Sequence, residues 1–196
     1  KALALARLIQ HGIDAPDGIA VTTAAYDDFL DQTGLRNPIH FELHRKPFEA
    51  MRWEELWDTA LRIRNMFAAA PWPGRLRKTI ASAIAKKFSD GAAAVRSSAP
   101  AEDSADASFA GLHESYVNIR GVDNVVDHVR LVWASLWSDA ALLYRQELGL
   151  DVEESRMAVV VQELVDGDCS GVAFGRDPGG GPGMVVESVY GLNAGL

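Results

Sequence analysis

The residue of this chain whose type and position best suit phosphate binding is Arg96. It follows the small apolar residues 92–95 and precedes two serines, which open a stretch rich in Ser, Ala and Asp. A guanidinium group at the end of a strand can form paired hydrogen bonds with a phosphate or stack on a base. The alternative is a surface arginine that pairs with Glu102 or Asp103. Residue chemistry by itself leaves both interpretations open.

The backbone of residues 162–165 is a second candidate for ligand binding. This segment, Gln-Glu-Leu-Val, follows three consecutive valines and precedes Asp166 and Gly167. A strand that passes directly into a turn presents consecutive N–H and C=O groups, which can hydrogen-bond the edge of an adenine. Many buried strands end in a polar residue, so this feature is not specific when taken alone.

The glycine cluster at residues 179–183 is not expected to bind phosphate. A phosphate-binding glycine loop lies between a strand and the N-terminus of a helix. Here a second strand-like segment, residues 184–190, follows the glycines, and there is no Gly-Lys-Ser/Thr sequence. We therefore expect a hairpin connection between two strands.

The histidines and the cysteine give little sign of a metal site or a nucleophile. The five histidines are His11, His40, His44, His113 and His128. We find no metal-ligand spacing among them, and the sequence leaves the metal ligands of the chain unknown. His113 could accept a phosphoryl group, but we do not expect this role. The single cysteine, Cys169, has no basic neighbour in sequence and is expected to be a small packed residue.

Composition limits the classes of function. The chain has 196 residues and a formal net charge of −8, which argues against nucleic-acid binding but not against a small anion held by local cations. No apolar run reaches the roughly 18 residues that would span a bilayer, so we expect no membrane insertion. One cysteine cannot form an internal disulfide, which favours a reducing compartment such as the cytoplasm.

Hydrophobic periodicity predicts a mainly helical first half. The expected elements are a helix over residues 2–10, a strand over 18–22, a helix over 24–33, a helix with Pro47 at its first position, and a helix carrying Leu76, Ile80, Ile84 and Phe88. Trp53 and Trp57 repeat at helical spacing with Leu56 and Ala60. We expect both tryptophans to lie in the core.

The second half is expected to mix strands with one long helix. The predicted elements are strands over 92–96 and 115–119, a helix over 125–147, and strands over 157–165, 170–175 and 184–190. The long connection over residues 95–115 is typical of a functional loop. These elements predict an α+β fold with a helix-rich part over residues 1–90 and a strand-rich part over 91–196, whose sheet is mixed or antiparallel.

Several segments, in a fixed order, resemble one known family. They are residues 1–26 (KALALARLIQHGIDAPDGIAVTTAAY), 95–121 (VRSSAPAEDSADASFAGLHESYVNIRG), 132–145 (VWASLWSDAALLYR), 159–165 (VVVQELV) and 170–178 (SGVAFGRDP). In this order they resemble the N-terminal nucleotide-binding domain of the phosphoenolpyruvate synthase and pyruvate phosphate dikinase family. The resemblance covers almost the whole chain and implies an incomplete ATP-grasp-like fold.

The resemblance also implies which residues bind ATP. Lys1 and Arg96 would contact the phosphates and act as the catalytic cations. The loop from Ser108 through Gly111 to Ser115 would close over them, with Ser115 where the family usually has threonine. The residues implied to line the adenine are Gln162, Glu163, Leu164 and Val165. Mg²⁺ is the implied metal cofactor, and its ligands are expected beyond Leu196.

The family implies a reaction that needs other domains. ATP would phosphorylate a histidine on a separate domain of the parent chain, for transfer to pyruvate. One alternative is the ATP-binding domain of a rifamycin-type antibiotic phosphotransferase, and a glucan-type dikinase is more distant. Another is a nucleotide-binding module without catalysis. Neither end of the chain has a polar tail, so we expect a fragment that is inactive when isolated.

Overall fold

The computed structural model describes residues 1–88, 91–99 and 111–191. The chain forms two compact units, Lys1–Leu164, here called the body, and Val165–Leu196, here called the hairpin unit. Strands and helices occur together in the body, and the α+β class predicted from the sequence is confirmed. The subdivision at residues 90 and 91 stays a prediction about how the domain is organised.

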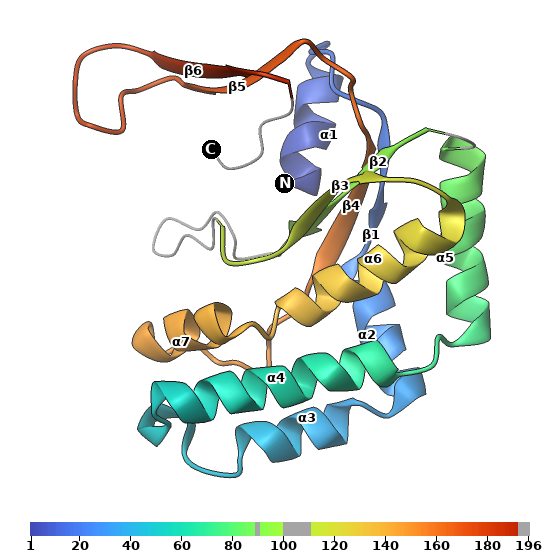
Figure 1. Cartoon of the computed structure of the whole chain (residues 1–196), viewed down its shortest axis with the longest axis vertical. Helices are drawn as coiled ribbons and strands as arrows, with labels where there is room; N and C mark the ends of the chain where they lie inside the picture. Colours follow the sequence, from blue (N-terminus) through green and yellow to red (C-terminus); the bar gives the residue numbers. More distant parts are fainter. Residues whose placement is uncertain (89–90, 100–110, 192–196) are drawn as a thin grey trace. The chain divides into compact units, whose positions relative to one another are not determined.

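A four-stranded antiparallel sheet forms the centre of the body (Figure 1). Its strands are β1 (Gly18–Val21), β2 (Ala93–Ser98), β3 (Ser115–Ile119) and β4 (Ala158–Glu163), in the order β1-β4-β2-β3. The sequence predicted all four to within a few residues. In the register of the sheet, Arg96 lies opposite Ser115 on β3 and opposite Val160 on β4.

Helices supply most of the remaining body. They are α1 (Ala2–Gln10), α2 (Thr23–Thr33), α3 (Arg36–Leu43), the 3-10 helix η1 (Phe48–Ala50), α4 (Trp53–Ala69), α5 (Gly74–Lys87), α6 (Val122–Ser135) and α7 (Asp139–Glu147). Helix α6 packs on β2 and β4, and α4 packs on α6 and α7. The core between them holds an aromatic cluster in which Trp133 contacts Tyr26 and Phe29.

The single helix expected over residues 125–147 is wrong, because the structure has two helices there. Ser138 has an extended backbone conformation, with ψ of 152°, and its Oγ accepts a hydrogen bond from the Ala141 N–H at 3.1 Å. A serine in this position caps a helix N-terminus, so it ends the first helix and starts the second. The apolar side chains expected on one face, among them Val129 and Trp133, are buried as predicted.

The expected burial of Trp53 and Trp57 is also wrong. Their exposed fractions are 65% and 47%. Helix α4 begins at Trp53 rather than at Pro47, which caps η1 instead, and the buried stripe of α4 includes Ile63 and Phe67. Trp57 therefore lies beside the buried stripe, and Trp53 lies in the exposed first turn.

The hairpin unit consists of β5 (Cys169–Phe174) and β6 (Val185–Tyr190), which pair in antiparallel fashion. This confirms the hairpin predicted around the glycine cluster. The Asp177 carboxylate orders the turn by accepting hydrogen bonds from the Gly179 and Gly181 N–H groups at 2.7 and 3.1 Å. Cys169 is exposed, so the expectation of a packed cysteine is wrong. No helix among the described residues is long and apolar enough to cross a membrane.

Candidate nucleotide-binding site

Arg96 and Gln162 meet on the central sheet. Arg96 is half-buried on β2, and its Nη1 donates a long hydrogen bond of 3.5 Å to the Gln162 Oε1. Gln162 is only 6% exposed, and its Nε2 donates to the Pro16 carbonyl oxygen at 3.0 Å. Both ends of this buried amide are therefore satisfied. The Gln162 side chain therefore contacts the Arg96 guanidinium group through its oxygen and the Pro16 carbonyl, just before β1, through its nitrogen.

Strand alternation places Arg96 on the side of the sheet away from the aromatic core. Val95 and Val161, which are fully buried, face the helices, so their neighbours Arg96 and Gln162 face the other way. On that side, residues of α1 line a cavity of about 180 Å³ together with Gln162. Helix α1 therefore covers the side of the sheet that carries Arg96.

The start of α1 is tied to the end of β2. The Lys1 Nζ donates to the Ser97 Oγ at 3.3 Å, and the Ala2 N–H donates to the Ser98 Oγ at 3.1 Å. These contacts join residues 96 positions apart in sequence. They bring together Lys1, the positive end of the α1 dipole and the residues directly after Arg96, which is an arrangement that favours a bound anion.

The structure describes only part of the loop implied by the resemblance. Ser115 is the first residue of β3 and lies opposite Arg96, so the two side chains share a face of the sheet. Gly111 is exposed in the turn before β3, with a φ of 77° that glycine adopts readily. Ser108, Glu102 and Asp103 lie outside the described residues.

The segment expected to line adenine ends β4. The Glu163 N–H donates to the Asp17 carbonyl at 2.8 Å, and the Leu164 N–H donates to the Ala92 carbonyl at 3.0 Å. These two donors therefore extend the sheet and do not face a base. Val165 belongs to the hairpin unit. The adenine contacts implied for residues 162–165 stay a prediction.

His113 is unsuited to accept a phosphoryl group. It is 8% exposed, and its Nδ1 contacts the Ser135 carbonyl at 3.4 Å. Burial, with the nearby cations of Arg145 and Lys1, lowers the pKa of His113 to about 4. The imidazole is therefore neutral and enclosed at pH 7.

The structure brings together three potential metal ligands that the sequence pattern did not predict. His40, His44 and Glu153 lie together in the body, so the expectation of no metal-ligand spacing among the histidines is wrong. The spacing of four residues between the two histidines was the available signal. Among the described residues, no second group of three such ligands exists, and none surrounds Arg96. The side chains described around Arg96 therefore do not form the carboxylate-rich set that Mg²⁺ prefers.

Comparison with known proteins finds one family model and several relatives that cover most of the chain. The pattern of the family described as the pyruvate phosphate dikinase AMP/ATP-binding domain matches residues 1–195. The phosphoenolpyruvate synthase of Aeropyrum pernix is 40% identical over 98% of the chain, and that of Pseudomonas aeruginosa is 39% identical over 96%. The rifampicin phosphotransferase of Bacillus subtilis is 34% identical over 86% of the chain and is covered over 19% of its own length.

The chain spans 24% of the length of each of these two phosphoenolpyruvate synthases. The match to the family pattern, in contrast, extends over nearly every residue of the chain. The chain therefore belongs to the pyruvate phosphate dikinase AMP/ATP-binding domain family.

Proposed function

We propose that this chain binds ATP and holds its phosphates next to Arg96 and Lys1. The observation that carries the proposal is the geometry at β2, where Gln162 contacts Arg96 and where Lys1 and the start of α1 are tied to the next two residues. The chain as a whole is acidic, with a formal net charge of −8. The cations proposed to bind phosphate are therefore local: Arg96 lies on β2, and the Lys1 ammonium contacts the next residue of that strand, Ser97.

In this proposal the side chains position and neutralise the polyphosphate. The guanidinium of Arg96 and the ammonium of Lys1 spread the negative charge of the transferring group, which is the main contribution a protein makes to phosphoryl transfer. The loop from Ser108 to Ser115 closes over the phosphates, and Ser115, on the same face as Arg96, supplies a hydroxyl donor. Residues 162–165 line the adenine through groups other than the Glu163 and Leu164 N–H donors, which belong to the sheet.

Mg²⁺ belongs to the proposal only as a partner of ATP. The described residues around Arg96 offer cations, hydroxyl groups and one amide, so the roles proposed for these side chains do not depend on contact with the metal. An ATP-grasp-like fold and a cytoplasmic location are further parts of the proposal. The first is implied by the resemblance, and the second is favoured by the single cysteine.

For the parent protein we propose a phosphoenolpyruvate synthase-like dikinase that phosphorylates a histidine on a separate domain, for transfer to pyruvate. The phosphoenolpyruvate synthase of Aeropyrum pernix matches more of the chain, and at higher identity, than the rifampicin phosphotransferase of Bacillus subtilis. The alternative acceptor is a rifamycin-type antibiotic. A pyruvate-dependent formation of AMP by the parent protein distinguishes these two acceptors.

A module that binds nucleotide without catalysis is the third possibility, because the chain spans about a quarter of its synthase relatives. Calorimetric titration of the chain with ATP and Mg²⁺ tests this possibility, which is supported if the chain binds ATP but forms no AMP.

The substitution Arg96→Ala tests the phosphate site. In the parent protein we expect kcat/KM for ATP to fall by roughly 30- to 1,000-fold, or about 2–4 kcal/mol, because a charged donor to the transferring group is lost. Steady-state kinetics measures the effect. The matched control is Arg75→Ala, which removes an exposed arginine from the first turn of α5. A kcat/KM within twofold of the wild-type value would remove Arg96 from the site.

A further inference from the structure

A cluster of three potential metal ligands lies in the body far along the chain from Arg96. His40 and His44 are one helical turn apart at the end of α3, and Glu153 comes from the segment between α7 and β4. The Glu153 Oε1 is 2.7 Å from the His40 Nδ1 and 3.2 Å from the His44 Nδ1. One ligand atom from each residue lies within 4.8 Å of the other two. Helix α3 and helix α1 lie at opposite ends of the body in Figure 1.

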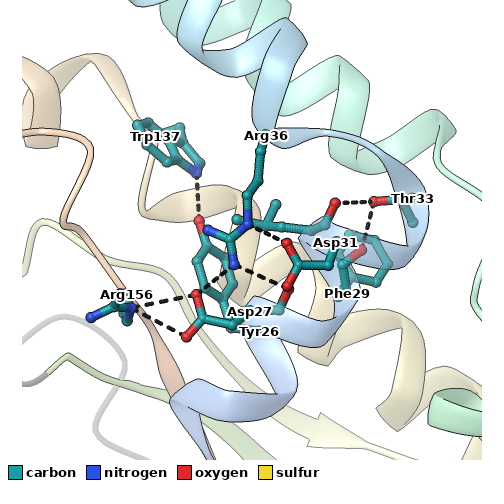
Figure 2. Close-up of polar contacts among 9 residues, drawn as sticks. Tyr26, Asp27, Phe29, Asp31, Thr33, Arg36, Trp137 and Arg156 are labelled. Carbon is teal, nitrogen blue, oxygen red and sulfur yellow. Dashed lines mark hydrogen bonds and ion pairs between the residues drawn. The ribbon is translucent and has the colours of Figure 1, made fainter.

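Ion pairs hold both ligand-bearing segments against the same helix, α2. Arg36, the first residue of α3, pairs with Asp31 and, at 2.9 Å, with Asp27. Arg156, three residues after Glu153, pairs with the same Asp27 at 3.2 Å. Figure 2 shows Asp27 between the two arginines. Asp27 therefore links α3 and the Glu153 segment to the same position on α2.

The hydrogen bond made by the His44 ring leaves a lone pair that can bind a metal. The His44 Nδ1 is 2.9 Å from the His40 carbonyl oxygen. A carbonyl oxygen only accepts, so the Nδ1 of neutral His44 carries the proton and the lone pair lies on Nε2. Histidines that bind metals commonly donate their other ring N–H to a carbonyl or carboxylate in this way.

We propose that His40, His44 and Glu153 bind one divalent transition-metal ion of the Zn²⁺ type. Two imidazole nitrogens and one carboxylate oxygen form a ligand set that Zn²⁺ accepts, with a fourth position for water. Ligand atoms around a tetrahedral zinc ion are about 3.3 Å apart, given bond lengths of about 2.0–2.1 Å. The ligand atoms of the cluster lie within 4.8 Å of one another, so they must move closer together to bind one ion. The three side chains are 45–61% exposed and can rotate by this small amount.

The fourth position would face open space. His44 and Glu153 line a cavity of about 670 Å³, and His40 and Glu153 line a neighbouring one of about 230 Å³. The cluster lies on the wall shared by these cavities, so a water molecule can reach the metal. A metal ion bound there would take the place of the proton between the His40 ring and the Glu153 carboxylate.

Titration calorimetry with ZnCl₂ tests the proposal on the whole chain, without a polyhistidine tag and in a Cys169→Ser background that removes the exposed thiol. At about pH 7.5 we expect one equivalent of Zn²⁺ to bind. His40→Ala, His44→Ala and Glu153→Gln should each weaken binding by more than about tenfold, the scale on which even outer partners of metal ligands act. Absorption of the Co²⁺-loaded chain should show tetrahedral bands.

The matched control is His11→Ala. The His11 Nδ1 also contacts the carbonyl four residues earlier, at 2.7 Å from Arg7, but it lies outside the cluster. This variant should bind Zn²⁺ like the background protein, and circular dichroism should show that all variants are folded. The absence of saturable binding, or binding that survives either histidine substitution, overturns the proposal. Wild-type affinity in Glu153→Gln would overturn the three-ligand site.

Discussion

The body contains a buried cation, Arg145, next to the end of a helix. Arg145 is 4% exposed, and its Nη1 donates to the Leu136 carbonyl at 2.7 Å, at the C-terminal end of α6. Burial lowers its pKa to about 10, so it stays charged at pH 7. A cation at a helix C-terminus is favoured by the helix dipole. The same charge disfavours protonation of His113 nearby.

The stability of the fold should depend on the titration of His113. Its pKa falls from 6.5 to about 4 on folding, so between these values the unfolded chain binds a proton that the folded chain excludes. The free energy of unfolding should therefore fall by up to about 3 kcal/mol as pH drops from about 6.5 to about 4. Above pH 6.5 His113 is neutral in both states, so none of this stability is lost there. Urea unfolding measured across this range checks the prediction.

The variant His113→Leu should lose this part of the pH dependence, because leucine does not titrate. His11→Leu, at an exposed histidine, is the control and should keep it. Parallel pH profiles for the wild-type protein and His113→Leu would show that burial does not hold His113 neutral.

At the scale of elements, a single side chain separates α6 from α7. The Ser138 Oγ accepts from the Ala141 N–H at 3.1 Å and donates to the Leu112 carbonyl at 3.2 Å. The first contact starts α7, and the second ties this start to the segment before β3. Because Arg145 and Gln146 on α7 line the cavity beside the proposed metal ligands, this cap also positions that wall.

Ser138→Ala should lower the free energy of unfolding by about 0.5–2 kcal/mol, because the orphan N–H groups of α7 lose their cap. Chemical denaturation of the two proteins measures the difference. Ser82→Ala is the matched control, since Ser82 is exposed in the interior of α5 and alanine is a better helix former there. Equal stability of Ser138→Ala and the wild-type protein would show that the cap is not what starts α7.

At the scale of the whole molecule, the hydrophobic core belongs to the body. Its buried members run from Val21 to Val161. Neither strand of the hairpin unit contributes a buried residue, and side chains such as Met184 and Tyr190 are largely exposed. Because burial of apolar area provides most of the folding free energy, the body should fold without the hairpin unit.

A chain that ends at Leu164 should unfold in one cooperative transition. We expect its midpoint within about 4 °C of the whole chain, which corresponds to roughly 1 kcal/mol at this size. Differential scanning calorimetry gives both midpoints. Ile63→Ala in the shortened chain is the core control and should cost about 2–5 kcal/mol. A shortened chain without a cooperative transition would show that the core needs the hairpin unit.

The sequence by itself determined the features that depend on near neighbours. Helix α1 and strand β3 have the predicted bounds, because the hydrophobic period of a helix or a strand is a local signal. The hairpin was predicted from the glycines that separate two strand patterns. The ordered segments that resemble the family also lie in the sequence, and the family match over residues 1–195 confirms them.

Only the tertiary structure decided which residues meet. The Gln162 side chain contacts Pro16, 146 positions away, and His40 contacts Glu153, 113 positions away, and no local pattern contains these pairs. The exposure of Trp57 was likewise decided by the side on which α4 packs. A sequence pattern reports the period of a helix or strand, whereas the packing of distant elements selects the buried face and the partners of each polar side chain.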